Sequence, residues 1–470
     1  LGENTRLRLD SRASFWQWNR HQSFEFQAPV AGGAFLPSRY EFSRTSNYGR
    51  IGTGTLTFSH ELNDQISLES TLLVQREQWE DGPERFEDFT PSGFVGASVF
   101  EAEGRLEETV FRQTVSWAPN DTHSLEFGTE AAFNARDTFL RLTFEPAAPP
   151  FVDDTLVEES RAELFANHVW SLTDDVSLES GLRYEFSEIS QSGGASRERT
   201  FSYPKPSFAL TWSASENTRW RFSLERDVDQ LDFSKFASSV NVTDNNTILG
   251  NPNYVPQRTW SVEAEWQRSF ANDASWTIRI GHDWIQDLDD FIPIVTPNGV
   301  FDAPGNIGDG TILRATTEWS APLDGIGLSN AVLTGFLEWY DTNVTDPLTG
   351  LDRNFSNIRE WEARLDFRQT FPQRQLAWGW DYYWLSDGDV YRAQELRHYG
   401  FTDGDLDVYV ETTRWDGITA RLGVNGAFMN GEDRERIFYN GSRATGAVTG
   451  IENQNGSNGP QFYVELRGTF

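Results

Sequence analysis

The chain has 470 residues, of which 38% are hydrophobic and 14% aromatic, and its formal net charge at pH 7 is −32. The mean hydropathy is −0.55 and we find no run of about 18 apolar residues, which excludes a helical membrane protein. The aromatic content excludes a disordered chain, and the negative charge argues against binding to nucleic acid.

The first predicted elements are β-strands in which apolar and polar residues alternate. We expect strands at residues 5–18 and 50–62, and the glycine- and proline-containing segment between them has room for another short hairpin. Residues 63–65 form a tight turn, and beyond it the alternation resumes from Ile66 to Val74. A period of two indicates strands with one apolar and one polar face.

The same pattern recurs to the end of the chain, with connections of two kinds. Short turns are predicted at residues 119–122, 173–175, 215–217, 271–273, 321–329, 372–374 and 416–417. Longer polar, aromatic and acidic segments lie near residues 80–104, 141–156, 187–199, 229–256, 286–310, 342–358, 386–404 and 430–459. Because short and long connections alternate strictly, the sequence predicts a transmembrane antiparallel β-barrel of the outer-membrane type, with short periplasmic turns and long extracellular loops.

Tryptophan positions agree with this interpretation. Seven tryptophans lie close to predicted short turns: Trp117, Trp170, Trp212, Trp220, Trp276, Trp319 and Trp415. Tryptophan prefers the boundary between membrane and water, so we expect these residues to form the periplasmic aromatic girdle. The alternative is that they are core aromatics of a large soluble β-protein.

The segment from Ile248 to Trp284 shows the pattern most clearly. A rigid turn at residues 250–256 contains a glycine and two prolines, which exclude helix. Two strands follow, and each carries tryptophans on one face and polar or charged residues on the other. Such a hairpin suits a lipid-facing wall, and its polar face must then look into a lumen.

The residues of this turn carry a resemblance to a known family. The run Gly250-Asn251-Pro252-Asn253-Tyr254-Val255-Pro256-Gln257 resembles the strand entry "GNP-x-L-x-P-E" of TonB-dependent outer-membrane receptors, with Gln257 where the family usually has Glu. The carboxy-terminal alternation of Phe462, Val464, Leu466 and Phe470 is similar to the assembly signal of bacterial outer-membrane barrels, with Gly468 where an aromatic residue is common.

The resemblance implies an active importer of the Gram-negative outer membrane, in which extracellular loops capture a solute and an amino-terminal plug couples to TonB. Nothing before Thr5 can form a plug, so we expect one barrel domain over residues 1–470 with the plug absent from the chain. A single methionine at position 429 and a start at Leu1 indicate that a signal peptide or more precedes this sequence. The pattern gives about 18 strands, and barrels with a plugged lumen have about 22, so we expect about 18–22.

Arginines on the polar faces are the first candidate site residues. Arg219, Arg221 and Arg226 share one strand with Glu225, and we expect these three arginines to face a substrate or a plug. Arg364 and Arg368 alternate in the same way with Glu362 and Asp366. The alternative is cross-strand ion pairing that stiffens the wall, which the acids at matching positions favour.

Acidic clusters are the second candidate. Asp287, Asp289 and Asp290 follow a strand and are expected to face the substrate or plug. Further aspartates, at positions 387, 389, 403, 405 and 407, could supply oxygens to a loop Ca²⁺. Asp-Gly is first a turn dipeptide, however, and no EF-hand pattern occurs, so turn chemistry is the preferred interpretation.

Enzyme chemistry finds no support in the sequence. There is no cysteine, and so no thiol nucleophile or thiolate metal site. The six histidines are widely separated along the chain and share no metal-binding spacing. No G-x-S-x-G elbow is present. We therefore expect no cofactor and no catalysis.

The predicted function is capture of a scarce solute and TonB-driven import, with a ferric siderophore as the first candidate cargo. Outer-membrane lipid, lipopolysaccharide, TonB and a small metal chelate are the expected partners. A passive porin and a surface-binding or structural barrel remain alternatives. The acidic balance disfavours a strongly anionic cargo unless the loops concentrate arginine.

Overall fold

The structure is a computed structural model that describes residues 4–29, 35–194, 196–241, 246–296, 299–402, 404–428 and 430–468. Its main element is a 19-stranded sheet. The strands of this sheet are β1 (Thr5–Pro29), β2 (Phe35–Asn63), β3 (Ile66–Thr90), β4 (Gly93–Asn120), β5 (His123–Glu145), β6 (Phe151–Thr173), β7 (Val176–Gly193), β8 (Arg197–Ser215), β9 (Thr218–Val228), β12 (Arg258–Ser269), β13 (Ser275–Gln286), β16 (Gly310–Pro322), β17 (Ala331–Thr345), β18 (Asp352–Arg353), β19 (Trp361–Phe371), β20 (Leu376–Leu385), β23 (Asp405–Trp415), β24 (Ile418–Asn425) and β27 (Gln461–Gly468).

Two four-stranded sheets are built from the long connections. One contains β10 (Ser239–Asn241), β11 (Asn246–Ile248), β14 (Asp289–Thr296) and β15 (Gly299–Asn306). The other contains β21 (Gly388–Tyr391), β22 (Glu395–Thr402), β25 (Asn430–Tyr439) and β26 (Val448–Asn458). The helical segments are the single 3₁₀ turns η1 (Phe233–Phe236), η2 (Ala271–Asp273), η3 (Asp324–Ile326) and η4 (Pro372–Arg374). In the ranges described, no helix has the length and apolar character needed to cross a membrane.

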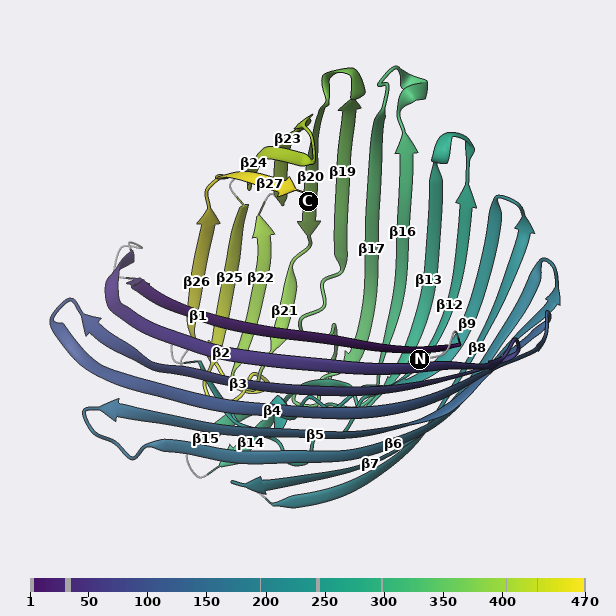
Figure 1. The fold of residues 1–470 in the computed structure, drawn as a ribbon. Helices are drawn as coiled ribbons and strands as arrows, with labels where there is room; N and C mark the ends of the chain where they lie inside the picture. Colours follow the sequence, from purple (N-terminus) through teal and green to yellow (C-terminus); the bar gives the residue numbers. More distant parts are fainter. Residues whose placement is uncertain are drawn as a thin grey trace.

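The main sheet is an antiparallel meander in which neighbours in the chain are neighbours in space. From β1 to β9 each strand pairs with the next, and β9 continues to β12, β13, β16 and β17. Figure 1 shows this sheet curving round, with β1 to β7 crossing the front and β12 to β20 standing upright behind them. Among the described residues β1 and β27 are the two edges, and no pairing joins them. The predicted barrel architecture, with about 18–22 strands, is confirmed.

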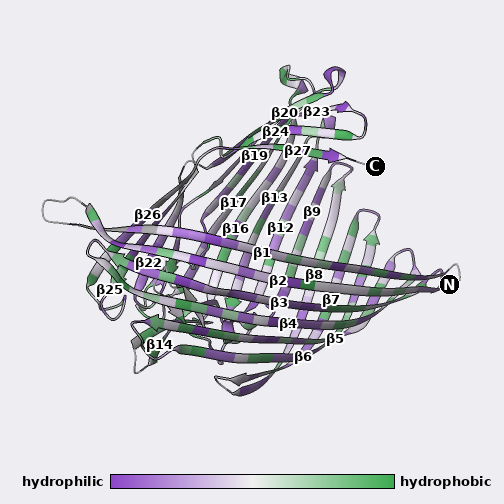
Figure 2. Cartoon of the chain, turned by 60° about the vertical axis from the view of Figure 1, so that its left-hand side comes forward, coloured by the Kyte–Doolittle hydropathy of each residue, from purple (hydrophilic) through white to green (hydrophobic). Residues whose placement is uncertain are grey.

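Each strand separates an apolar face from a polar one. In the β12–β13 hairpin Trp260 lies opposite Trp284 and Ala264 opposite Ile280, whereas Glu265 lies opposite Arg279 on the other face. Figure 2 shows hydrophobic and hydrophilic residues alternating along many of the strands. The apolar face is solvent-exposed in the isolated chain, as an outer surface that contacts lipid must be.

The predicted girdle tryptophans share this outer face near the short turns. Trp212 lies opposite Trp220, which lies opposite Trp266, and Trp276 lies opposite Trp319. The ring centroids of Trp266 and Trp276 are 5.9 Å apart. Trp415, next to the turn at Asp416-Gly417, is 56% exposed. Neighbouring strands therefore place their tryptophans in one row, as a membrane boundary requires.

The short turns lie where the sequence predicts them, but the first long connections do not. Residues 80–104 and 141–156, predicted as loops, are mostly strand, because β3 continues to Thr90, β4 begins at Gly93, β5 continues to Glu145 and β6 begins at Phe151. The extra hairpin expected between residues 18 and 50 is also wrong, since β1 and β2 continue through its described part. Only about 9–11 residues are needed to cross the hydrocarbon. Beyond that depth both faces of a strand meet water, so hydropathy no longer alternates and no longer reports a strand.

The turn at residues 250–256 is pinned to the loops around it. A Cβ on Gly250 would lie 2.1 Å from the carbonyl oxygen of Phe236, so only glycine fits there. The side chain of Asn251 accepts a hydrogen bond from the backbone N–H of Asn253 (2.9 Å) and donates one to the carbonyl of Pro304 (2.8 Å). Tyr254 is buried in a cluster of Val157, Ile189, Leu231, Phe233 and Phe236. This motif therefore fastens the connection between β9 and β12 to the wall.

Candidate functional site

Two of the predicted arginines lie on the polar face of β9, and one of them, Arg221, is bound by the wall. Arg221 donates two hydrogen bonds to the carboxylate of Glu179, at 3.1 and 3.0 Å, and one to the hydroxyl of Thr211. Arg219 shares this face, opposite Gln267 of β12. The arginine–carboxylate pairing that the sequence allowed as an alternative is thus present at Arg221.

Arg226 does not belong with them. The register of β9 and β12 places it opposite Trp260, on the apolar outer face, where it donates to the carbonyl of Pro204 (3.1 Å). The expectation that Arg226 faces a lumenal substrate or plug is therefore wrong. Successive side chains of a strand point to opposite faces, so residues an even number apart share a face. Arg219 and Arg221 are two residues apart and share one, whereas Arg226 is five residues from Arg221 and lies on the other.

Arg364 and Arg368 also contact acids of their own wall. Arg364 lies 3.1 Å from Asp366 and 3.6 Å from Asp381. Arg368 lies 2.7 Å from Glu411, which is shared with Arg421. The contact with Asp366 lies within β19, the one with Asp381 reaches the neighbouring β20, and the one with Glu411 reaches β23 beyond it. These arginines are therefore ion-paired within the wall, as in the alternative interpretation.

The three adjacent aspartates, 287, 289 and 290, bind three different partners. Asp287 forms an ion pair with Arg258, and Asp289 forms one with Lys235. Asp290 accepts hydrogen bonds from Arg353 (2.9 Å) and from the hydroxyl of Ser356 (2.8 Å). The structure therefore uses these aspartates to tie the β13–β14 connection and the start of β14 to neighbouring segments.

A buried arginine network extends from Asp290 into the other loops. Asp346 lies 2.7 Å from Arg353 and 2.5 Å from Arg443, and its side chain is only 2% exposed. Burial alone would raise the pKa of Asp346, but hydrogen bonds from Arg443, the Thr349 backbone and Arg353 lower that pKa to about 2. Asp346 is therefore ionised at neutral pH and joins the connection after β17 to the one between β25 and β26.

Two of the aspartates considered for calcium have clear protein partners. Asp389 contacts His398 and accepts from the Tyr391 hydroxyl (3.0 Å), and Asp407 accepts from the backbone of Gly426 (3.1 Å). Asp403 lies outside the described residues. Where the chain is described, no three His, Asp or Glu side chains are grouped to hold a metal ion. Loop calcium stays a prediction.

Two histidines that are far apart in sequence meet in space. The Nδ1 of His123 is 2.9 Å from the Nε2 of His168, and their rings stack at 5.2 Å. The pair lies beside Trp170 near the short-turn end of β5 and β6. Strand pairing brings them together, which spacing along the chain could not reveal.

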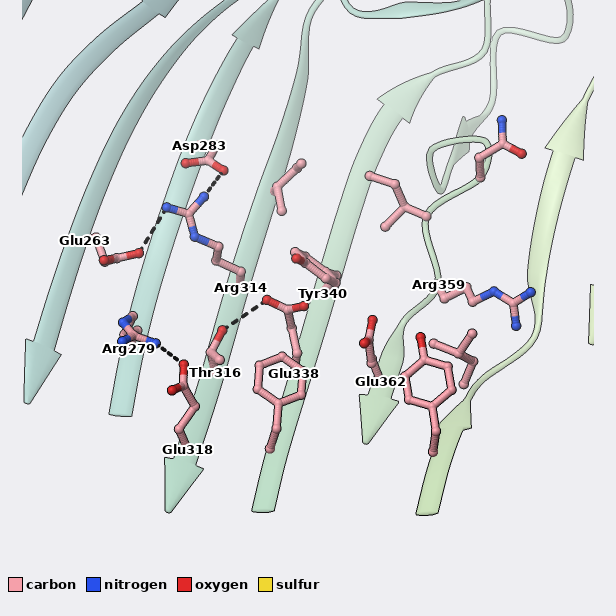
Figure 3. A pocket seen from close by; sticks show the side chains of 16 residues that line it. Glu263, Arg279, Asp283, Arg314, Thr316, Glu318, Glu338, Tyr340, Arg359 and Glu362 are labelled. Atoms are coloured by element: carbon pink, nitrogen blue, oxygen red, sulfur yellow. Dashed lines mark hydrogen bonds and ion pairs between the residues drawn. The ribbon is translucent and has the colours of Figure 1, made fainter. Parts of the chain in front are cut away.

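The wall contains a cavity of about 830 Å³, which we call the wall cavity. Its lining comes from the polar faces of β12, β13, β16, β17, β19 and β20 and from residues 357–359. Five acidic side chains line it, against three arginines: Glu263, Asp283, Glu318, Glu338 and Glu362, with Arg279, Arg314 and Arg359. Figure 3 shows these side chains projecting from neighbouring strands into one space.

On one side of the wall cavity every carboxylate contacts an arginine, and each of the two arginines is shared by two carboxylates. Arg314 pairs with Asp283 and lies 3.1 Å from Glu263. Arg279 lies 2.5 Å from Glu318 and 2.7 Å from Glu265. Dashed lines in Figure 3 mark the contacts of Arg314 with Asp283 and Glu263 and of Arg279 with Glu318. This side of the cavity is an ordinary ion-paired wall.

On the other side two carboxylates have no basic partner. Glu338 of β17 lies directly opposite Glu362 of β19, and no ion pair joins either to a described arginine, lysine or histidine. Glu338 accepts a hydrogen bond from the hydroxyl of Thr316 (3.1 Å). The phenols of Tyr340 and Tyr383 lie beside Glu338 and Glu362, respectively. Like charges directly opposite each other destabilise a sheet, so this placement is not explained by wall stability.

Sequence reasoning did not single out this cavity. The strand pattern placed Arg279, Asp283 and Glu362 on polar faces, which the structure confirms. The strand pattern does not give the register between β17 and β19. The pairing of Glu338 with Glu362 depends on that register. Glu338 and Glu362 stand on the two strands that flank one long connection, and that repeated glutamate is the signal that could have indicated the pair.

Comparison with known proteins identifies the family. The model of the family "TonB dependent receptor-like, beta-barrel" matches residues 1–461, and the chain belongs to this family. The family consists of outer-membrane transport receptors, not enzymes. A search of curated protein sequences found no match.

Three solved structures illustrate the shared fold. The ferric-catecholate import receptor Fiu from E. coli K12 superposes with a TM-score of 0.62 at 9% identity, covering 100% of this chain and 78% of Fiu. The siderophore receptor PiuA from Acinetobacter baumannii gives 0.61 at 11% identity, covering 98% and 78%. The copper transporter OprC gives 0.59 at 12% identity, covering 97% and 76%. At these identities the likeness establishes the fold alone.

Proposed function

We propose that this protein captures a metal chelate, with a ferric siderophore as the first candidate, and imports it across the outer membrane with energy from TonB. The observation that carries the proposal is the family match over residues 1–461. Energy would reach the barrel through a plug domain that contacts both TonB and the lumenal wall. Import requires differential binding followed by release, and no catalytic chemistry in the wall.

The lumenal and loop chemistry supports capture of a small polar solute. The connections after β13, β17, β20 and β24 bring buried arginines together, with Arg353, Arg436 and Arg443 each at most 12% exposed in their side chains. Each contacts a carboxylate of another loop: Arg353 contacts Asp290, Arg436 contacts Glu395 and Arg443 contacts Asp346. The loops are therefore tied to one another rather than being separate flexible ends. A rigid polar surface over a lumen is what selective capture of a scarce solute needs.

The test is uptake of radio-iron chelates by intact cells that express the complete receptor. We expect accumulation that requires both the receptor and TonB, and receptor expression that rises when iron is withheld. Accumulation independent of TonB, or expression indifferent to iron, would contradict the proposal. A strain that makes an unrelated receptor provides the background.

A passive porin is the competing function, because it would use a similar hairpin barrel. Single-channel conductance of the complete protein in planar bilayers separates the two. The import proposal predicts no steady open channel. A stable ohmic conductance at rest would favour the porin.

Lipid contacts are expected on the outer face. Arg50 and Arg105 flank Gln78 on neighbouring strands and lie six residues beyond Leu56 and Phe111, respectively. Six residues of strand span about 20 Å, so these arginines lie beyond the apolar belt on its far side from the short turns. We propose that they contact phosphates of lipopolysaccharide. Binding to bis-phosphorylated lipid A that is unchanged in the variant Arg50→Ala with Arg105→Ala would contradict this.

A further inference from the structure

We propose that the wall cavity binds a protonated amine or guanidinium group, and that this group is the cationic end of the imported solute. The second part rests on the proposed import function, whereas the first part does not. Three features of the cavity carry the inference: its unmatched carboxylates, its aromatic surface and a buried carboxylate oxygen that lacks a donor.

The unmatched carboxylates provide the charge. Glu338 and Glu362 are directly opposite each other across an antiparallel pair, which puts their Cβ atoms about 5 Å apart. Both are partly buried, and no described basic side chain forms an ion pair with either. Two carboxylates held at this spacing fit a single group that is positively charged and donates several hydrogen bonds.

Aromatic rings surround the same position. Phe336 and Tyr340 flank Glu338 on the polar face of β17, and Tyr383 of β20 lies next to Glu362. Phenylalanine and tyrosine faces attract ammonium and guanidinium ions, and the attraction grows when water is excluded. A strongly hydrated inorganic ion gains less from such a surface than an organic cation does.

The third feature lies on the opposite side of the cavity. Asp283 is 5% exposed, and although one of its oxygens binds Arg314, the other, Oδ1, is buried without any hydrogen-bond partner. A buried acceptor without a donor costs free energy unless a ligand supplies the donor. Asp283 and the Glu338–Glu362 pair line the same 830 Å³ cavity, so a molecule with donors at both ends can contact both.

The cavity has the size of a small-molecule site. Ligand pockets have volumes of about 300–1,000 Å³ and combine apolar walls with a few placed polar groups. Ile312, Ile358 and Leu385 provide apolar wall beside the aromatic rings and carboxylates. The site therefore suits an alkylamine or alkylguanidine arm rather than a bare ion.

The first experiment measures binding by the complete receptor in detergent, with 1,4-diaminobutane as the probe and 1,4-butanediol as its neutral counterpart. We expect calorimetric binding of the diamine and none of the diol. The double variant Glu338→Gln with Glu362→Gln should bind the diamine at least tenfold more weakly. Glu318→Gln, which lines the same cavity but is paired with Arg279, should bind as the wild type does. Heat-modifiable electrophoretic mobility verifies that each variant is folded.

Three results would overturn the cation site. They are no binding of the diamine to folded wild-type protein, equal loss in the Glu318→Gln control, and displacement of the diamine by equimolar Ca²⁺. The last result would identify the carboxylates as a metal site instead.

A second experiment separates this inference from the import proposal. It compares TonB-dependent uptake of a linear ferric trihydroxamate that ends in a free amine with uptake of its N-acetylated form. Faster uptake of the free amine than of its acetylated form, with this difference lost in the double variant, supports both the import proposal and the cation site. Equal uptake of the two forms keeps import but overturns the cationic cargo. Uptake of neither form, with diamine binding intact, overturns this import assignment and leaves the cation site standing.

Discussion

The lumenal wall on β6 to β8 and the wall on β16 to β19 are built from the same kinds of residue, but they treat charge in opposite ways. Lys205 lies 2.5 Å from Glu163 and 2.8 Å from Glu185, so these two opposed carboxylates share a basic partner. Glu338 and Glu362 face each other across β17 and β19 without one. The first arrangement stabilises the sheet and the second does not. The difference teaches that the second wall is where the structure leaves charge available for a ligand.

The largest expected effect is in the matched wall. Lys205→Met removes a shared partner of two carboxylates whose side chains are only 9% and 11% exposed, and it leaves Glu185 without one while Glu163 keeps only Arg183 at 3.4 Å. Breaking a buried ion pair by removing one member costs about 3–5 kcal/mol. Urea unfolding in lipid vesicles should show this loss, whereas Lys205→Arg should retain most of the stability. A loss below 1 kcal/mol on the scale of exposed pairs would mean that the wall is hydrated and that the contrast between the two walls is weaker than the structure shows.

The next effect tests the faces themselves. Phe222 is on the apolar face of β9 and 45% exposed in the isolated chain, and its neighbour Ser223 lies opposite Glu263 on the polar face. Arginine on the lipid side of a barrel costs about 2–4 kcal/mol near the bilayer midplane. We expect Phe222→Arg to be destabilised by this amount and Ser223→Arg to be nearly neutral, because position 223 faces the polar lumen beside the carboxylate of Glu263. The same folding assay checks both, and equal effects would contradict the assignment of faces.

Acid should loosen the loop network without disturbing either wall. The pKa of Asp346 falls from 3.8 to about 2 in the folded state, so its contribution is present above about pH 4 and is lost as the pH falls towards 2. A shift of this size corresponds to about 2–3 kcal/mol. Hydrogen exchange of residues 346–353 should accelerate over this pH range. In Asp346→Asn it should be fast throughout, and an unchanged acid response in that variant would assign the effect to other groups.

The smallest effect has the opposite sign. Replacing Glu338 and Glu362 together with glutamine removes a like-charge pair, and such cross-strand pairs are worth about 0.2–1 kcal/mol. We expect the unfolding midpoint in urea to stay the same or to rise slightly. A clear loss of stability in this variant would show that the two carboxylates support the wall and would remove the contrast with Lys205.

Residue pattern was sufficient to predict the faces and the short turns, because period-two alternation and turn residues are local properties. Trp260 and Trp284 lie opposite each other on the predicted apolar face, and the turn at Asp416-Gly417 lies where it was expected, with Gly417 at a φ of 69°. The family followed from the turn at Gly250-Asn251-Pro252, which the family match confirms.

Long-range partners could not be predicted in the same way. Loop packing decides which acid binds Arg353, and strand register decides which glutamate faces Glu338. Neither is encoded in local spacing. The strands β3 to β6 were cut short because their outer parts meet water on both faces, so hydropathy no longer alternates there. Phe470, the last residue of the predicted terminal signal, lies outside the described residues.

The central claim is that the charged face of β17 borders the lumen while its apolar face borders lipid, and cysteine labelling tests it most directly. The chain has no native cysteine, so Leu337→Cys and Glu338→Cys each introduce one reactive group, one residue apart and on opposite faces. After refolding of the 470-residue chain into lipid vesicles, a charged maleimide should label position 338 quickly and leave position 337 unlabelled. Equal labelling of the two positions, or the reverse order, would contradict the account.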